Sequence, residues 1–251
     1  MRRASVVAAV LVTACSTGSA PPATVAAGAS APSTSTTTVV ESTPVPAVAL
    51  PAGFALHEDI GMVIVSAPGI RVEEHSLSVT LPDANVAARV NAGLADLLDT
   101  LVDELAMSGA MGDVTISHDV LLFSSKVLSV RWIVSGPDTL WVETSSYDLS
   151  VGAPLRLSSA LVGTNALILL SDLVSRSLIE EVYGGDADAL ADFADPVLPR
   201  HIAYATSGIQ VSFDPGEVAA TGTGVVTVQV PWSELGSAVR ADGPFADYRG
   251  S

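Results

Sequence analysis

The chain has 251 residues, and its 27 acidic residues outnumber its 11 lysines and arginines, which gives a formal net charge of −16. This balance excludes nucleic acid and anionic membrane surfaces as natural partners, and it favours basic proteins through electrostatic steering. Acidity also keeps an exported domain soluble, so both interpretations of the charge stay open. The only cysteine excludes a disulfide within the chain.

Residues 1–14 are typical of an export signal. Arg2 and Arg3 precede a short apolar run that is too short to span a bilayer. The run ends in Leu-Val-Thr-Ala-Cys, the order of a bacterial lipoprotein cleavage site, which predicts that Cys15 is the lipid attachment site. An ordinary secretory signal with an incidental cysteine is the alternative, and the choice between the Sec and twin-arginine routes stays open. Cleavage would leave 9 basic residues against 27 acidic ones, a net charge of −18.

The segment 15–53 is predicted to be a disordered tether. After Cys15 it consists almost entirely of Ala, Ser, Thr, Pro, Gly and Val, and Glu41 is its only charged residue. It has neither a helical nor a strand period. We therefore expect a domain exported to the outer face of the cytoplasmic membrane, which contacts the membrane through its lipid anchor only.

A single folded domain is predicted for residues 54–251, because the composition changes there to alternating apolar and charged residues. Five segments are predicted strands: 60–65, 76–81, 114–123, 127–134 and 140–149. The last three follow one another with short links, which favours an antiparallel meander.

Two main helices are predicted. The first begins after Asp83, its expected N-cap, has one apolar stripe and stops at Gly109 and Gly112. The stripe contains Val86, Val90, Leu94, Leu97, Leu98, Leu101 and Leu105. The second is expected over 165–183, with Gly184 and Gly185 as its C-cap. Its expected apolar positions are Leu167, Leu170, Val174, Leu178 and Val182. A further helical turn is expected within 186–193.

The segment 208–239 predicts a closing β-hairpin. Ile209, Val211 and Phe213 alternate with polar residues, and the same pattern recurs over 226–230 before Pro231 ends it. The connection over 215–224 is too long for a tight turn and predicts a structured loop. The whole pattern indicates class α+β: an antiparallel β-sheet packed by two main helices and closed by a C-terminal hairpin.

No catalytic motif is recognisable, so the sequence predicts neither an enzyme nor a cofactor. The four histidines, His57, His75, His118 and His201, do not have the spacing of a known metal motif. Glu73 and His75 would share a strand face and could supply two zinc ligands, but no third is identifiable. Ser117, His118 and Asp119 are neighbours on one strand and cannot form a triad. No metal ligand and no catalytic residue is therefore assigned.

A group of aspartates in the segment 186–195 could supply oxygen ligands for calcium. Asp186, Asp188, Asp192 and Asp195 follow two glycines but lack the spacing of an EF-hand. An N-cap followed by a solvated helix face is the simpler interpretation, and whether this segment binds calcium stays open.

The closing segment resembles the RsiV-like domain family, which also has an Asn near the start of its first helix, where Asn91 stands here. The shared elements are Phe213-Asp214-Pro215, a Gly-containing loop with Gly224, a β-run, and Pro231-Trp232-Ser233-Glu234-Leu235. The family usually has an aromatic residue after Asp-Pro, where this chain has Gly216. Its members include extracellular domains, among them the lysozyme-binding part of an anti-sigma factor.

Together with the anchor expected at Cys15, this resemblance implies a lipid-anchored extracytoplasmic binding domain whose partner is a basic protein such as lysozyme, or a cell-wall polymer. The alternative is a carrier of a lipid or another hydrophobic molecule in an apolar cavity between sheet and helices. The binding residues and the oligomeric state are left open.

Overall fold

The computed structural model describes residues 50–65, 69–163, 165–193, 197 and 199–249. The chain divides into two units, Met1–Thr36 and Thr37–Ser251, and every described residue belongs to the second. The expected signal peptide, Cys15 and the expected tether before Leu50 lie outside the described residues.

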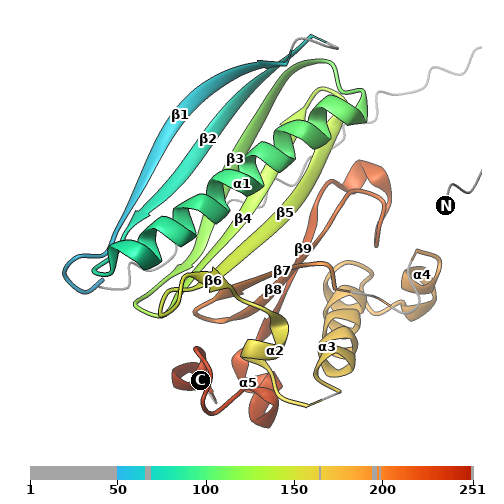
Figure 1. Cartoon of the computed structure of the whole chain (residues 1–251). Helices are drawn as coiled ribbons and strands as arrows, with labels where there is room; N and C mark the ends of the chain where they lie inside the picture. Colours follow the sequence, from blue (N-terminus) through green and yellow to red (C-terminus); the bar gives the residue numbers. More distant parts are fainter. Residues whose placement is uncertain (1–49, 66–68, 164, 194–196, 198, 250–251) are drawn as a thin grey trace, which may run out of the picture. The chain divides into compact units, whose positions relative to one another are not determined.

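Six strands form the larger sheet, in the sequential order β1 to β6 (Figure 1). They are β1 (Ala55–Val65), β2 (Ile70–Thr80), β3 (Gly112–Phe123), β4 (Val127–Gly136), β5 (Thr139–Asp148) and the short β6 (Ala153–Pro154). Every neighbouring pair is antiparallel except β2 and β3, which pair in parallel over Ile70–Glu74. The α+β class and the meander β3–β4–β5 are thus confirmed.

Helix α1 (Ala84–Ser108) explains the parallel pair, because it connects β2 to β3 along one face of the sheet (Figure 1). Its 25 residues span roughly 37 Å, about the length of an 11-residue strand. The helix therefore returns the chain to the end where β2 began.

The sequence features of α1 act as predicted. The Asp83 side chain accepts hydrogen bonds from the amides of Asn85 and Val86, and Gly109 ends the helix with φ +77°. Six of the seven expected apolar positions are buried, whereas Leu97 is half-buried. These residues pack on β2, β3 and β4 and form the first core.

A second, three-stranded sheet follows, formed by β7 (His201–Ala205), β8 (Gly208–Phe213) and β9 (Val226–Pro231). Hairpin β8–β9 is the predicted one, and its connection contains a 3₁₀ turn over Thr221–Thr223. The sequence did not reveal β7 or β6, because five and two residues are too few for a clear alternation.

Helices α2 (Leu157–Ala160), α3 (Ala166–Glu181), α4 (Ala187–Ala191) and α5 (Trp232–Leu235) accompany the second sheet, with α3 packed on β9. In α3 the expected stripe is correct at Leu170, Val174 and Leu178, but Leu167 and Val182 are exposed. None of the helices within the described residues has the length and apolar character needed to cross a membrane.

The second core is built around stacked aromatic rings. The Phe245 ring stacks on both Tyr204 and Trp232, with ring centroids 4.5 and 4.8 Å away. The indole N–H of Trp232 donates to the carbonyl of Ala205 (3.1 Å). Phe245 is fully buried. The residues after the hairpin therefore belong to the core.

Polar contacts join the two sheets. The amide of Tyr204 donates to the buried hydroxyl of Ser129 (2.8 Å) on β4. Arg131, also on β4, pairs with Asp119 (2.6 Å) and donates to the hydroxyl of Thr227 (3.2 Å) on β9. The Tyr204–Ser129 and Arg131–Thr227 hydrogen bonds therefore tie the second sheet to β4, while Asp119 of β3 holds Arg131 in place.

Candidate functional site

A tight turn at the end of β8 presents two carboxylates side by side. Residues Asp214-Pro215-Gly216-Glu217 close it with a hydrogen bond from the Glu217 amide to the Asp214 carbonyl (3.1 Å). The φ of +92° at Gly216 meets the requirement of a type II turn at its third position, and proline is common at the second. The Asp214 amide in turn donates to Glu217 Oε2 (2.9 Å). The unusual Gly216 is thus what permits the turn.

His201 stands beside this turn, because β7 begins where its partner β8 ends. Its Nε2 lies 3.6 Å from Asp214 Oδ2, and its Nδ1 lies 3.6 Å from Oε1 of Glu143 on β5. Both distances exceed that of a hydrogen bond. The Nδ1 atom is buried, and within the described residues no hydrogen-bond partner reaches it.

Both carboxylates that flank His201 also accept backbone hydrogen bonds. Asp214 Oδ1 accepts from the amide of Val142 (2.8 Å) on β5, and Glu143 Oε1 accepts from the amide of Thr144 (2.8 Å). The cluster therefore also satisfies amides along the part of β5 that β6 leaves unpaired.

The charges of the cluster act on one another. Asp214 first and Glu143 second raise the pKa of His201 to about 9, against the opposing effect of burial. Burial acts to raise the pKa of Glu143, but His201 and the Thr144 amide outweigh it and lower this pKa overall. In the absence of any other cation, His201 is therefore an imidazolium at neutral pH.

His201, Asp214 and Glu217 also form a group that could hold a metal ion, with one ligand atom from each lying within 4.8 Å of the others. The spacing of His201 and Asp214 in the sequence did not connect them, because His201 begins β7 and Asp214 follows β8. The available signal was the Asp-Pro-Gly-Glu turn, which predicts two adjacent carboxylates.

The pair Glu73 and His75 does share a strand face, as expected, with His75 Nε2 3.3 Å from Glu73 Oε1. Glu58 of β1 approaches the other ring nitrogen, with 3.0 Å between Nδ1 and Oε1. These carboxylates lie at opposite ends of the ring, so they do not converge on one point.

The remaining candidate residues have structural roles. His118 contacts the carbonyl of His75 (3.1 Å) and packs on Trp132, whereas the neighbouring Asp119 pairs with Arg131. Asp186 is the N-cap of α4 and accepts from two amides, as the simpler interpretation proposed. Asp195 lies outside the described residues.

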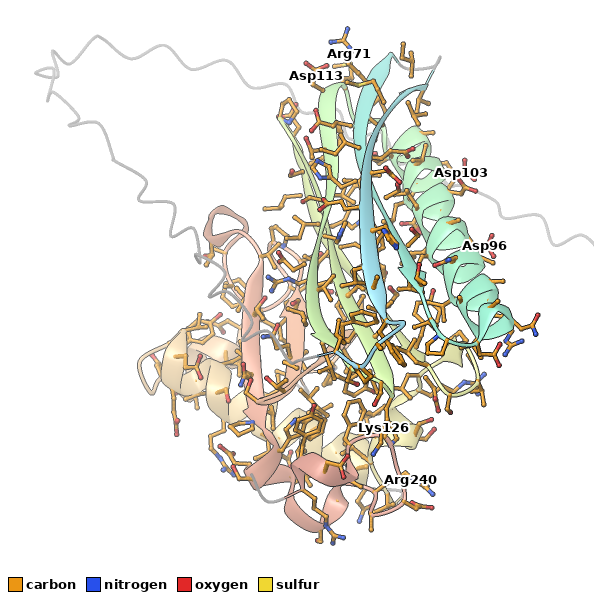
Figure 2. All side chains as sticks on the ribbon, turned by 90° about the vertical axis from the view of Figure 1, so that its left-hand side faces the viewer. Arg71, Asp96, Asp103, Asp113, Lys126 and Arg240 are labelled. Atoms are coloured by element: carbon orange, nitrogen blue, oxygen red, sulfur yellow. The ribbon has the colours of Figure 1, made fainter. Side chains whose placement is uncertain are left out.

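An acidic face lies on the outer side of α1. We use this name for the exposed residues Asp96, Asp99, Asp103 and Glu104. Figure 2 shows Asp96 and Asp103 directed away from the sheet. Among the ion pairs of the described residues, none involves these four. Their charge acts inward too, since Asp96, after burial, contributes to raising the pKa of Tyr147 to about 12.

A surface hollow of about 410 Å³ lies between α2, the start of α3 and Arg240. Its lining is mainly aliphatic: Leu157, Leu161, Val162, Ala166 and Leu167, with Ser158 and Arg240 as polar members. An adjoining hollow of about 360 Å³ shares Val162 and Ala166. The carrier alternative expects an apolar cavity between sheet and helices, whereas both of these hollows are at the surface beside α2 and the start of α3.

Two solved structures share this fold. A DUF3298 family protein from Bacteroides fragilis superposes with a TM-score of 0.59 at 14% identity, covering 78% of this chain and 98% of that one. The fold is that of DUF3298 proteins. A second member, from Pseudomonas aeruginosa, gives a TM-score of 0.55 at 14% identity, with 74% and 94% covered. No family model and no curated protein matches the sequence. At this identity the likeness shows the DUF3298-like fold and leaves the function to be argued from the residues.

Proposed function

We propose that the chain is a lipid-anchored extracytoplasmic binding domain, without catalytic activity, that recognises a basic protein through the acidic face of α1. The observation that supports this proposal is the placement of the four carboxylates. Asp96, Asp99 and Asp103 repeat at spacings of three and four, where like charges repel across a helix surface. Asp103 and Glu104 lie near the C-terminal end of α1, where negative charge also opposes the helix dipole.

This arrangement costs α1 stability, and no ion pair among the described residues offsets that cost, which supports a partner that neutralises the charge. Most positive charges of the domain are engaged at other places. Six of its nine lysines and arginines already pair with carboxylates elsewhere. A basic protein such as a lysozyme complements the acidic face, and so does a cationic cell-wall component.

Calorimetric titration of the chain with a lysozyme at two salt concentrations tests this proposal. One variant neutralises the acidic face by Asp96→Asn, Asp99→Asn and Asp103→Asn. The matched control neutralises three exposed carboxylates of α3, by Asp172→Asn, Glu180→Gln and Glu181→Gln. Both variants change the net charge equally.

We expect salt-weakened binding that the α1 variant reduces about tenfold or more, at roughly 0.5–1 kcal/mol for each lost charge contact. The α3 variant should bind almost as the unaltered chain does. An equal loss of affinity in both variants would mean that only the net charge of the domain matters, which would contradict a specific role for the acidic face. If no heat of binding is measured even at low salt, lysozyme is excluded as the partner, and a cell-wall polymer becomes the favoured one.

The anchor and its location belong to the same proposal. Cys15→Ser should abolish incorporation of labelled palmitate and release the chain from the membrane fraction. Retention of the label in that variant would contradict lipidation at Cys15.

The alternative, a carrier of a hydrophobic molecule, is favoured by the hollow beside α2 and α3. Its volume of about 410 Å³ falls in the range of small-molecule sites. The carrier proposal predicts saturable binding of a fluorescent fatty acid, weakened by Leu167→Asp, since Leu167 lines the hollow and is 46% exposed.

A further inference from the structure

We propose that Nε2 of His201, together with one carboxylate oxygen each from Asp214 and Glu217, binds a Zn²⁺ ion. The site would tie the start of β7 to the turn that follows β8, next to the edge of β5. It is independent of the acidic face and of the hollows.

The spacing of the donor atoms fits a metal better than a hydrogen bond. Two ligands of tetrahedral zinc, at about 2.0–2.2 Å from the ion, lie about 3.4 Å apart. His201 Nε2 and Asp214 Oδ2 are 3.6 Å apart, too far for a hydrogen bond and close to that separation. Glu217 completes a set of three ligand atoms within 4.8 Å of one another, which leaves further positions for water.

The surroundings have the form of a metal-bound histidine. Such a histidine donates the N–H of its other ring nitrogen to a carboxylate, which fixes the ring and increases its basicity. Here Glu143 faces Nδ1 of His201 at 3.6 Å, on the side away from Asp214. Nδ1 is buried without a hydrogen-bond partner among the described residues, so a small rotation of the ring toward Glu143 would satisfy it. Glu143 is thus a positioning residue.

The donor set also selects the ion. One imidazole with two carboxylates suits zinc, whereas calcium prefers six or more oxygens. Arg200 approaches Glu217 Oε1 at 3.3 Å, but its side chain is 69% exposed. A surface ion pair of this kind is weak, so the guanidinium can yield to the metal.

His75 supplies a matched control within the same chain. It also lies between two carboxylates, those of Glu58 and Glu73, but each makes a hydrogen bond to a different ring nitrogen. No free ring nitrogen faces two acids at once, so His75 should not bind zinc.

The test is calorimetric titration of zinc sulfate into the metal-stripped chain. All samples carry Cys15→Ser, because a thiol binds zinc on its own. We expect one ion per chain. His201→Gln and Asp214→Asn should remove this binding, and Glu143→Gln should weaken it about tenfold to 100-fold, the usual effect of an outer carboxylate. His75→Gln should leave the affinity unchanged within about twofold, and calcium chloride should not bind.

Circular dichroism of each variant without metal separates lost binding from lost folding. Asp214→Asn keeps an oxygen for the Val142 amide, so it carries the test if His201→Gln does not fold. The proposal is overturned if the unaltered chain binds no zinc, leaving His201 as an imidazolium between carboxylates. It is equally overturned if binding survives Asp214→Asn or disappears in His75→Gln.

Discussion

We predict that Asn91 contributes more to the free energy of unfolding than any exposed polar residue of α1. Its side chain holds the backbone of β2 at Val79 with two hydrogen bonds. The Val79 amide donates to Oδ1 (2.8 Å), and Nδ2 donates to the Val79 carbonyl (3.0 Å). Strand β3 pairs with β2 only over Ile70–Glu74, so beyond Glu74 this edge of β2 has no strand beside it.

The substitution Asn91→Ala leaves a backbone donor and a backbone acceptor without partners beside a residue that is 3% exposed. Each unsatisfied buried group costs about 1–3 kcal/mol, but water reaches this half-buried site in part, so we expect a loss of about 2–4 kcal/mol. With an m value of roughly 2–3 kcal/mol per M, the midpoint of urea unfolding should fall by about 1 M.

The matched control is Asn85→Ala, in the exposed first turn of the same helix. It should change the free energy of unfolding by less than about 0.5 kcal/mol. Equal unfolding midpoints for the two variants would refute the assignment of Asn91 as the residue that closes the edge of β2.

Three further predictions concern other parts of the fold. Gly216→Ala forces a side chain into φ +92° and should cost about 1 kcal/mol or more in urea unfolding, together with a weaker affinity for zinc. Arg131→Gln should lower the free energy of unfolding by about 1–3 kcal/mol, because it leaves the half-buried carboxylate of Asp119 unpaired. Its control is Arg71→Gln, which removes an exposed ion pair with Asp113 at one end of the sheet (Figure 2) and should change stability by less than about 0.5 kcal/mol. The hydrogen bond with Glu58 raises the pKa of His75, so its stabilising effect is complete below about pH 6.5 and is lost as the pH rises through the raised pKa. A proton NMR titration should show this pKa falling in Glu58→Gln, and an unchanged pKa there would contradict the assigned cause.

Features encoded by neighbouring residues were predictable from the sequence. The apolar stripe of α1, its Asp83 cap and the alternation in β8 and β9 each follow from residues a few positions apart. Such patterns are local, and the fold retains them because burial and capping act on the same residues. The α+β class follows from their order along the chain.

Features encoded by distant residues were not predictable. The exposure of Leu167 in α3 depends on what packs against that helix, and no local period contains that information. The candidate metal site is a stronger case, since His201 reaches the Asp214–Glu217 turn only because β7 pairs with β8, and Glu143 reaches His201 only because β5 lies beside the second sheet. A motif search by spacing fails when the histidine and the carboxylates come from different elements.

The two histidines flanked by acids show what makes the difference. His75 receives its carboxylates from its own strand and from the strand beside it, where the pleat places them at opposite ends of the ring. His201 receives one carboxylate from β5 and two from a turn, and the turn places both of these on the same side of the ring. In the strand pair, each ring nitrogen of His75 has one carboxylate, so no ring nitrogen faces two carboxylates. The turn instead brings two carboxylates together beside His201, and this is the arrangement that a metal ion needs.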